Sequence, residues 1–436
     1  MSETRPAAPA VEPPEARPIG DPLMDVVDLH THFPVRAGMF SRQTEHIRAV
    51  DGVTFDIAKG EVFGLVGESG SGKTTLGRSL LKLVQPTSGT ITYGGQDLVP
   101  LRERDMRPLR RELALVFQDP NASLNPAMTV AQGVGHPLRI HKLATTRAEV
   151  RTRVAEMLER VGLTPPDKFL DSYPEDLSGG QKQRLVIARA LITEPRFVVA
   201  DEPVAALDMS VRARVLELML ELQRDFGLTY LFITHDLATA RFVCDRIGIL
   251  YLGNMVEWGH ADTLFDDPQH PYTRALLDAI PLPDPARGTR EKVLPTGEVP
   301  DAQQPPAGCR FHPRCPAAFD ACGWEGPDLV DLFEQRWTEL DSETFEAELA
   351  ATGDLDAADV SRDRIRFDSA DPDRLVTLLE RMRSRGEHPL FTAVEAIEHD
   401  SGGVAVVFGD GPEPALQPVA GRLVACHLHG VTERRR

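Results

Sequence analysis

The sequence is poor in cysteine and has no long apolar run. It contains five cysteines in 436 residues, and no stretch reaches the roughly 18 apolar residues that a helix needs to cross a bilayer. The N-terminus also lacks the basic-then-apolar layout of a signal peptide. We therefore expect a cytosolic protein, or one held at the cytoplasmic face of the cell membrane only through a partner, and no disulfides in that compartment.

Positive charge is the second scarcity. The 66 acidic residues outnumber the 48 basic ones and give a formal net charge of −18, which argues against binding nucleic acid through a basic face. Only seven of the basic residues are Lys, against 41 Arg. This bias occurs in halophilic organisms, and a GC-rich genome, which also favours Arg, is the alternative explanation.

The chain divides by composition into three parts. Residues 1–22 contain six prolines and little apolar material, so we predict a disordered N-terminal segment. Residues 23–265 alternate short apolar runs with amphipathic helical stretches, as an α/β domain with a mostly parallel sheet does. Residues 266–436 form a C-terminal extension, whose first part, 266–308, is rich in proline and looks like a linker.

An acidic insertion interrupts the C-terminal extension at about 325–400. It carries 21 acidic and 8 basic residues, so it supplies −13 of the net charge. Helical spacing of Leu375, Leu378, Leu379 and Met382, and a strand-like run at Val404–Phe408, predict that the insertion is folded.

Three apolar runs in the α/β part are followed at once by polar residues. They are Val62–Val66, Phe197–Ala200 and Tyr230–Ile233. Short runs that are apolar throughout are typical of parallel strands buried on both faces. Ligand sites of such sheets lie at the carboxyl ends of the strands, so we look for functional residues there.

The first run leads into a phosphate-binding motif, G-x-x-x-x-G-K-[ST], and then into a helix-compatible stretch at Thr75–Leu83. The alternative, a chance glycine loop, is opposed by this strand–loop–helix context. Lys73 is expected to reach the β- and γ-phosphates of a nucleotide, and the Thr74 hydroxyl to bind Mg²⁺. The predicted phosphate-binding residues are Gly67, Glu68, Ser69, Gly70, Ser71, Gly72, Lys73, Thr74 and Thr75.

Polar residues also follow three other predicted strands. Asp201 and Glu202 end the second run, where Asp201 is expected to hold Mg²⁺ and Glu202 to polarise the attacking water. His235 ends the third run and can reach a γ-phosphate, and Gln118 ends a shorter one and can contact Mg²⁺ or the water. Taken singly, each is as well explained by an ordinary strand-end residue.

A turn with two glycines opens a predicted helix. Its residues are Leu177, Ser178, Gly179, Gly180 and Gln181. Ser178 is a good N-cap, and exposed backbone amides at a helix N-terminus bind anions. By itself this pattern indicates no more than an ordinary capped helix.

The order of these motifs along residues 25–262 resembles that of ABC ATPases. The resemblance implies an α/β P-loop NTPase fold of ABC type, with an antiparallel β part and a helical subdomain at about 119–175. It makes Leu177–Gln181 the signature motif and assigns Asp208 to the loop between subunits. Two such domains would pair head to tail, so that Lys73 of one and Ser178–Gly180 of the other enclose one ATP. His235 would be the switch residue, and Thr74, Gln118 and Asp201 the Mg²⁺ ligands.

Two positions depart from the family pattern. Ala205 stands where the family often has Ser, which should matter little because Asp208 remains. The aromatic residue that stacks on adenine is not evident, and Phe33 and His46 are both candidates.

The C-terminal extension resembles that of dipeptide/oligopeptide importer ATPases, in particular the F-type subunit. The resemblance rests on His270–Leu277 and Gly308–Pro316, supported upstream by His32–Arg36 and Leu124–Pro126. It implies a peptide importer with a second ATPase subunit, identical or different, two transmembrane permease subunits and, indirectly, an extracellular solute-binding protein. Importers of nickel, glutathione or sugars share much of this pattern and stay as alternatives.

Four of the five cysteines lie in the extension. The spacing of Cys309, Cys315 and Cys322 is compatible with unligated thiols in a loop as well as with a metal site. Family members can carry a [4Fe–4S] cluster here, with a fourth cysteine in a Cys-His-Leu sequence that Cys426–Leu428 matches. Zinc is the alternative metal. The insertion separates Cys322 from Cys426 by 103 residues, and Cys244 in the core is expected to act as a buried small hydrophobe.

Two other classes of protein compete with a transporter subunit. Soluble ABC proteins of DNA repair or translation carry tandem ATPase domains, coiled coils or basic arms, and none occurs here. A redox-sensing protein would not need the full set of hydrolytic residues. We therefore expect an ATPase that converts ATP and water to ADP and phosphate and couples this to transport.

Overall fold

The structure is a computed structural model. It describes residues 21–36, 44–279, 295, 297–400, 402–409 and 411–430. Almost all of the segment predicted to be disordered, and most of the proline-rich 280–296, lie outside this part of the chain.

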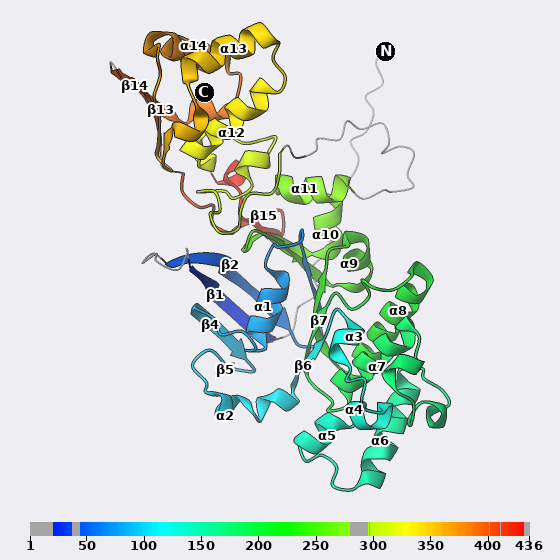
Figure 1. The fold of residues 1–436 in the computed structure, drawn as a ribbon. Helices are drawn as coiled ribbons and strands as arrows, with labels where there is room; N and C mark the ends of the chain where they lie inside the picture. The colour runs from blue at the N-terminus through cyan, green and yellow to red at the C-terminus, as the bar shows by residue number, and fades with distance from the viewer. Residues whose placement is uncertain are drawn as a thin grey trace, which may run out of the picture.

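The core is an eight-stranded sheet in the order β15-β16-β10-β9-β3-β8-β7-β6 (Figure 1). Strands β6, β7, β8, β3 and β9 run parallel, and β10 pairs antiparallel with β9. Every residue of β3, β7, β8 and β9 is buried, which confirms the three apolar runs as central strands. The bounds are β3 Val62–Val66, β6 Leu113–Val116, β7 Phe197–Asp201, β8 Thr229–Thr234, β9 Arg246–Tyr251 and β10 Asn254–His260.

A second, antiparallel sheet in the order β2-β1-β4-β5 covers one face of the core. Together with helix α1, it packs on Phe63, Leu65 and Val199 of the core sheet. This arrangement confirms the mostly parallel sheet with an antiparallel part. The elements are β1 Pro22–Arg36, β2 Thr44–Ala58, β4 Ser88–Tyr93, β5 Gln96–Asp97, α1 Lys73–Leu80 and α2 Glu103–Met106.

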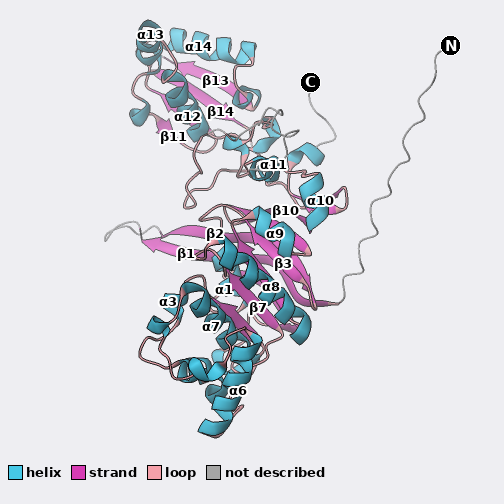
Figure 2. Cartoon of the chain, turned by 90° about the vertical axis from the view of Figure 1, so that its right-hand side faces the viewer, coloured by secondary structure: helices cyan, strands magenta, loops and turns pink. Residues whose placement is uncertain are grey.

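Helices cover the other face and continue beyond it. Figures 1 and 2 both show α6 at the end of the molecule opposite α12–α14. The helices are α3 Pro120–Ser123, α4 Val130–Val134, α5 His136–Ile140, α6 Arg147–Arg160, α7 Gly179–Leu191, α8 Met209–Phe226 and α9 Leu237–Val243. No helix in the described ranges combines the length and the apolar content that crossing a lipid bilayer requires.

The stretch expected to be a linker is partly helical, which corrects that expectation. Helix α10 (Ala261–Asp266) is followed by α11 (Pro271–Asp278), which begins with Pro at its first position. Proline there is compatible with a helix because its missing N–H needs no partner in the first turn. Tyr272 is fully buried and stacks near Tyr251 and Phe311, so α11 is anchored to the core.

The acidic insertion has a hydrophobic core of its own, which confirms that it is folded. Leu375, Leu378, Leu379 and Met382 are buried on α14, as their spacing predicts, and the run at Val404–Phe408 lies in β14. Its sheet has the order β11-β12-β14-β13. The bounds are α12 Gly326–Trp337, α13 Ser342–Thr352, α14 Pro372–Arg385, β11 Asp359–Val360, β12 Arg364–Phe367, β13 Val394–Asp400 and β14 Gly403–Phe408.

After the insertion the chain returns to the core, which the sequence analysis did not foresee. β16 (Arg422–Val424) pairs with β10 and with β15 (Gln417–Val419), so the last strands widen the core sheet. Gly323 and Gly411, which flank the insertion, lie close together. A Cβ added at Gly411 would lie 2.0 Å from the Cα of Gly323.

Candidate functional site

The phosphate-binding motif forms the loop between β3 and α1. The buried Lys73 ammonium donates to the carbonyl oxygens of Gly67 at 2.8 Å and Glu68 at 2.7 Å. Burial lowers the pKa of Lys73, while the charges of Glu202, Asp201 and Glu68 oppose this. Gly72 has φ 101° and leaves no room for a side chain, since a Cβ would lie 2.0 Å from the Ala49 carbonyl oxygen.

Thr74 and Asp201 lie together, as predicted for Mg²⁺ ligands. The Thr74 hydroxyl donates to Asp201 Oδ1 at 3.0 Å. Burial raises the pKa of Asp201, and this hydrogen bond and the nearby Arg78 lower it. A hydroxyl next to a carboxylate supplies the hard oxygen ligands that Mg²⁺ prefers, so the residues fit the ion.

Two of the predicted catalytic side chains converge on one carboxylate oxygen of a third. Gln118 Nε2 lies 3.2 Å and His235 Nδ1 3.1 Å from Glu202 Oε2. These side chains come from the ends of β6, β8 and β7, which are neighbours in the sheet order. Glu202 has φ 46°, an unfavourable conformation for a residue with a side chain, and its N–H donates to the Ile233 carbonyl at 3.0 Å. The backbone therefore holds Glu202 in one position.

The signature residues form a separate, exposed helix N-terminus. Ser178 caps α7 by accepting from the N–H of Gln181, and the Gln181 side chain accepts from the Ser178 N–H at 2.9 Å. Gly180 packs against Val211 in the first turn of α8, just after Asp208. Ser178 and Gly179 are exposed. No hydrogen bond among the described residues joins Ser178 or Gly179 to the phosphate loop of the same chain.

The structure shows a contact between the C-terminal extension and the phosphate loop that could not be predicted from the sequence. Arg314 Nη1 lies 3.1 Å from Glu68 Oε2, and Tyr272 Oη accepts from the Glu68 N–H at 3.1 Å. Arg314 directly precedes Cys315 in the chain. Arg314 and Glu68 are 246 positions apart, and neither motif signals the pairing.

Replacing Arg314 by Ala is expected to weaken ATP binding. Without Arg314, the Glu68 carboxylate would lack a partner and would repel the phosphates expected beside it. One charged hydrogen bond of this kind contributes on the order of 1.5 kcal/mol, which corresponds to roughly tenfold in affinity. Titration with a fluorescent ATP analogue measures it. The Arg314→Ala/Glu68→Gln double variant should recover most of the lost ATP affinity. If it binds ATP as weakly as the single variant, repulsion between Glu68 and the phosphates is not the cause.

The four cysteines of the extension are free thiols in a buried region. The Cys309 N–H donates to the Cys322 carbonyl at 2.9 Å. Burial raises the pKa of Cys315 to about 12 and that of Cys322 to about 11, and the pKa values of Cys309 and Cys426 are raised for the same reason. The charge of Cys426 also contributes to the raised pKa of each of the other three thiols.

Cys244 lies elsewhere, against Gly64 of the core sheet, where a Cβ would come 2.7 Å from its Sγ. Its thiol is buried, and burial raises its pKa well above the usual range. The prediction that it acts as a small core hydrophobe is confirmed.

A phosphate loop, a carboxylate pair at the end of β7 and an exposed capped helix define a nucleoside-triphosphatase of the ATP-binding cassette type. The family model "ABC transporter" matches residues 50–205, and "Oligopeptide/dipeptide transporter, C-terminal region" matches 256–322. The putative oligopeptide transport ATP-binding protein YkfD of Bacillus subtilis is 49% identical over 71% of this chain and 92% of its own.

Two other relatives have similar names. The oligopeptide transport ATP-binding protein AppF of Bacillus subtilis is 46% identical over 71% of this chain and 94% of its own. A putative peptide import ATP-binding protein of Brucella ovis is 49% identical over 71% and 95%. A solved structure of the ATP-binding cassette MJ0796 aligns with a TM-score of 0.49 at 31% identity, over 55% of this chain and 98% of that one. The chain belongs to the ATP-binding proteins of ABC transporters.

Proposed function

We propose that this chain is the ATP-hydrolysing subunit of an importer for peptides of the dipeptide or oligopeptide class. The observation that carries the proposal is the presence, in one chain, of an ATP site and a C-terminal region of the oligopeptide/dipeptide transporter type. The printed names of the relatives agree with this solute class. Nickel, glutathione or a sugar is the alternative cargo.

Uptake by the whole transporter tests which class of solute it carries. This chain, its permease subunits and its solute-binding protein are reconstituted in vesicles with ATP on the cytoplasmic side. We expect accumulation of a labelled dipeptide or oligopeptide that stops without ATP. Accumulation of nickel, glutathione or a sugar, with no peptide uptake, would instead establish the alternative.

In this proposal hydrolysis depends on positioning and charge stabilisation. Lys73 and the loop amides would bind the β- and γ-phosphates. The Thr74 hydroxyl, the Gln118 amide and the Asp201 carboxylate would hold Mg²⁺, whose charge would neutralise part of the phosphate charge. Glu202 takes the proton of the attacking water. His235 contacts the same carboxylate and orients the γ-phosphate.

The signature residues are proposed to act on the ATP of a partner ATPase subunit. Support comes from their exposure and from the open space at Gly179, where a Cβ would meet nothing within 4 Å. An N-terminal helix end facing a γ-phosphate would close the dimer on ATP, and phosphate loss would open it. The region at 119–175 would pass this motion to two permease subunits, and so hold the chain at the membrane.

Ser178→Arg should leave ATP binding by the single subunit intact and block ATP-dependent pairing, because a bulky cation fills the space for the partner's nucleotide. Light scattering with ATP, in a Glu202→Gln background, measures the dimer. Ser342→Arg, at an exposed helix start in the insertion, is the matched control. A Ser178→Arg dimer as abundant as that of the control would count against the head-to-tail arrangement.

We further propose that Cys309, Cys315, Cys322 and Cys426 ligate a [4Fe–4S] cluster, with Zn²⁺ as the alternative. Support comes from four buried or half-buried free thiols, of which Cys426 contributes by its charge to the raised pKa of each of the other three. Four thiolates suit either metal centre. A cluster would link the segment that carries Arg314 to the returning strands at the end of the chain.

Protein purified without oxygen should be brown and contain about four iron and four sulfide per chain. Cys426→Ser should lose most of this iron, whereas Cys244→Ala, in the core, should retain it. Iron and sulfide analysis with absorption spectra gives the measurement. Colourless protein with one zinc would exclude the cluster, and iron content untouched by Cys426→Ser would exclude the fourth ligand.

A further inference from the structure

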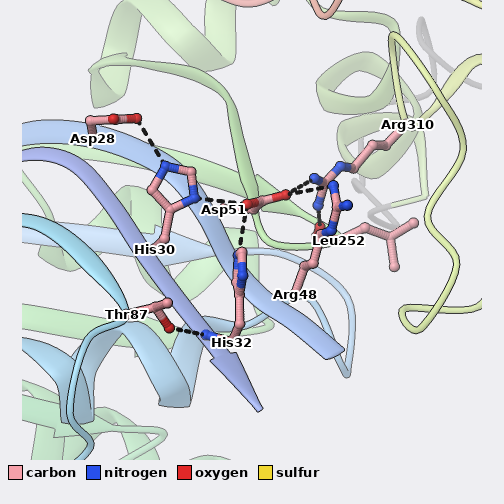
Figure 3. Close-up of polar contacts among 8 residues, drawn as sticks. All are labelled: Asp28, His30, His32, Arg48, Asp51, Thr87, Leu252 and Arg310. Carbon is pink, nitrogen blue, oxygen red and sulfur yellow. Dashed lines mark hydrogen bonds and ion pairs between the residues drawn. The ribbon is translucent and has the colours of Figure 1, made fainter. Parts of the chain in front are cut away.

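Two histidines and an aspartate meet where the antiparallel sheet faces the C-terminal extension (Figure 3). His30 and His32 lie two positions apart on β1, and Asp51 lies on the adjacent β2. Irregularities of the β1–β2 register fall between Leu29 and His32, and such bulges re-aim side chains. One ligand atom of each of the three residues lies within 4.8 Å of the other two.

The imidazole nitrogens and carboxylate oxygens of this cluster approach one another in a way that a positive charge would stabilise. His30 Nδ1 lies 2.8 Å from Asp51 Oδ1, and His30 Nε2 lies 3.1 Å from Asp28 Oδ1. A neutral imidazole has only one N–H, so one of its nitrogens then directs a lone pair at a carboxylate oxygen. His32 Nε2 lies 2.8 Å from the same Asp51 Oδ1. A positive charge between the rings and Asp51, whether a proton or a metal ion, resolves this conflict.

We propose that His30 Nδ1, His32 Nε2 and Asp51 Oδ1 bind one divalent transition-metal ion. Two imidazole nitrogens and one carboxylate oxygen suit Zn²⁺, Co²⁺, Ni²⁺ or Cu²⁺ and not Mg²⁺ or Ca²⁺, which take oxygen ligands. The site is therefore chemically distinct from the proposed magnesium site, and it differs from the cysteine cluster because it has no thiolate.

The surroundings provide support for the ligands and a path for the ion. Asp28 on His30 Nε2 makes the carboxylate–histidine pair that fixes the tautomer of a metal-bound imidazole. His30 and Asp51 line a cavity of about 740 Å³ between the antiparallel sheet and the C-terminal extension. Water or a solute donor can fill the remaining coordination positions from this cavity.

Four other charged groups face the site. Arg310, which is buried, pairs with Asp51 Oδ2, and Arg48 lies 3.7 Å from the same oxygen. They hold the carboxylate so that Oδ1 points at the histidines, and their charge weakens the binding of a dication. Asp28 and Glu413, which also line the cavity, offset part of that charge. We therefore expect weaker binding than at a closed structural zinc site.

Cobalt binding by the whole, untagged protein tests the proposal. Anaerobic protein with its cysteine centre filled is titrated with Co²⁺, and binding is followed by equilibrium dialysis and absorption. Wild type should bind one more Co²⁺ than the His30→Ala/His32→Ala variant, without a sulfur-to-cobalt charge-transfer band. His399→Ala, at an exposed strand histidine in the insertion, should bind as wild type does. Asp28→Asn should weaken binding by about ten- to a hundredfold.

Two results would overturn the site. One is an equal number of Co²⁺ ions in wild type and in the double variant, with ATP binding showing that the variant is folded. A second measurement needs no variant and so applies even if the double variant fails to fold. Cu²⁺ bound to wild type should give an electron paramagnetic resonance spectrum with coupling to two imidazole nitrogens. A spectrum without nitrogen coupling excludes His30 and His32 as ligands.

Discussion

Glu202→Gln should bind ATP as wild type does and hydrolyse it at least about a hundredfold more slowly. The amide has the shape of the carboxylate but cannot take a proton from water, and general-base catalysis contributes about a hundredfold to ten-thousandfold. Glu202 is also the shared partner of Gln118 and His235. Nucleotide binding and phosphate release, measured side by side, distinguish a loss of ATP binding from a loss of hydrolysis.

The exposed Glu221 on α8 provides the control. Glu221→Gln removes the same charge from the chain, so a general effect of charge would slow it equally, and we expect no change. Near-normal phosphate release by Glu202→Gln would exclude this residue as the base and direct attention to His235.

Lys73→Ala should lose nucleotide binding itself, by about ten- to a hundredfold. The buried ammonium is held by the Gly67 and Glu68 carbonyls, and a hydrogen bond to a charged group contributes about 1.5–3 kcal/mol. Without it the phosphates face carbonyl oxygens and the nearby carboxylates with no compensating cation.

Equilibrium binding of ATP, compared with that of Lys59→Ala at an exposed turn, measures this loss. Unchanged affinity in Lys73→Ala would mean that residues 67–75 are not the phosphate site. Circular dichroism of both variants distinguishes lost contacts from lost folding.

The convergence of the candidate ATP-site residues could be predicted from the sequence because each lies in a local pattern. Each of Gln118, Asp201 and His235 follows a short apolar run, and a parallel sheet brings the ends of such runs to one edge. The Ser178 cap is likewise a local pattern, and the structure confirms Ser178 as the N-cap of α7.

Contacts between residues far apart in the chain could not be predicted from the sequence. Arg314 and Glu68 are 246 positions apart, and Arg310 and Asp51 are 259 apart. The return of β16 to β10 depends on a two-residue pairing that leaves no periodic signal. The proline content around helix α11 indicates a linker, but Pro271 stands at the first helical position, where a helix accepts proline.

The meeting of Gly323 and Gly411 makes the acidic insertion exchangeable. A segment that enters and leaves at one point puts little strain on its host, so a short tether between these two glycines would keep the chain connected. A foreign domain whose own termini lie equally close, such as a fluorescent reporter, could be grafted there without altering the core sheet.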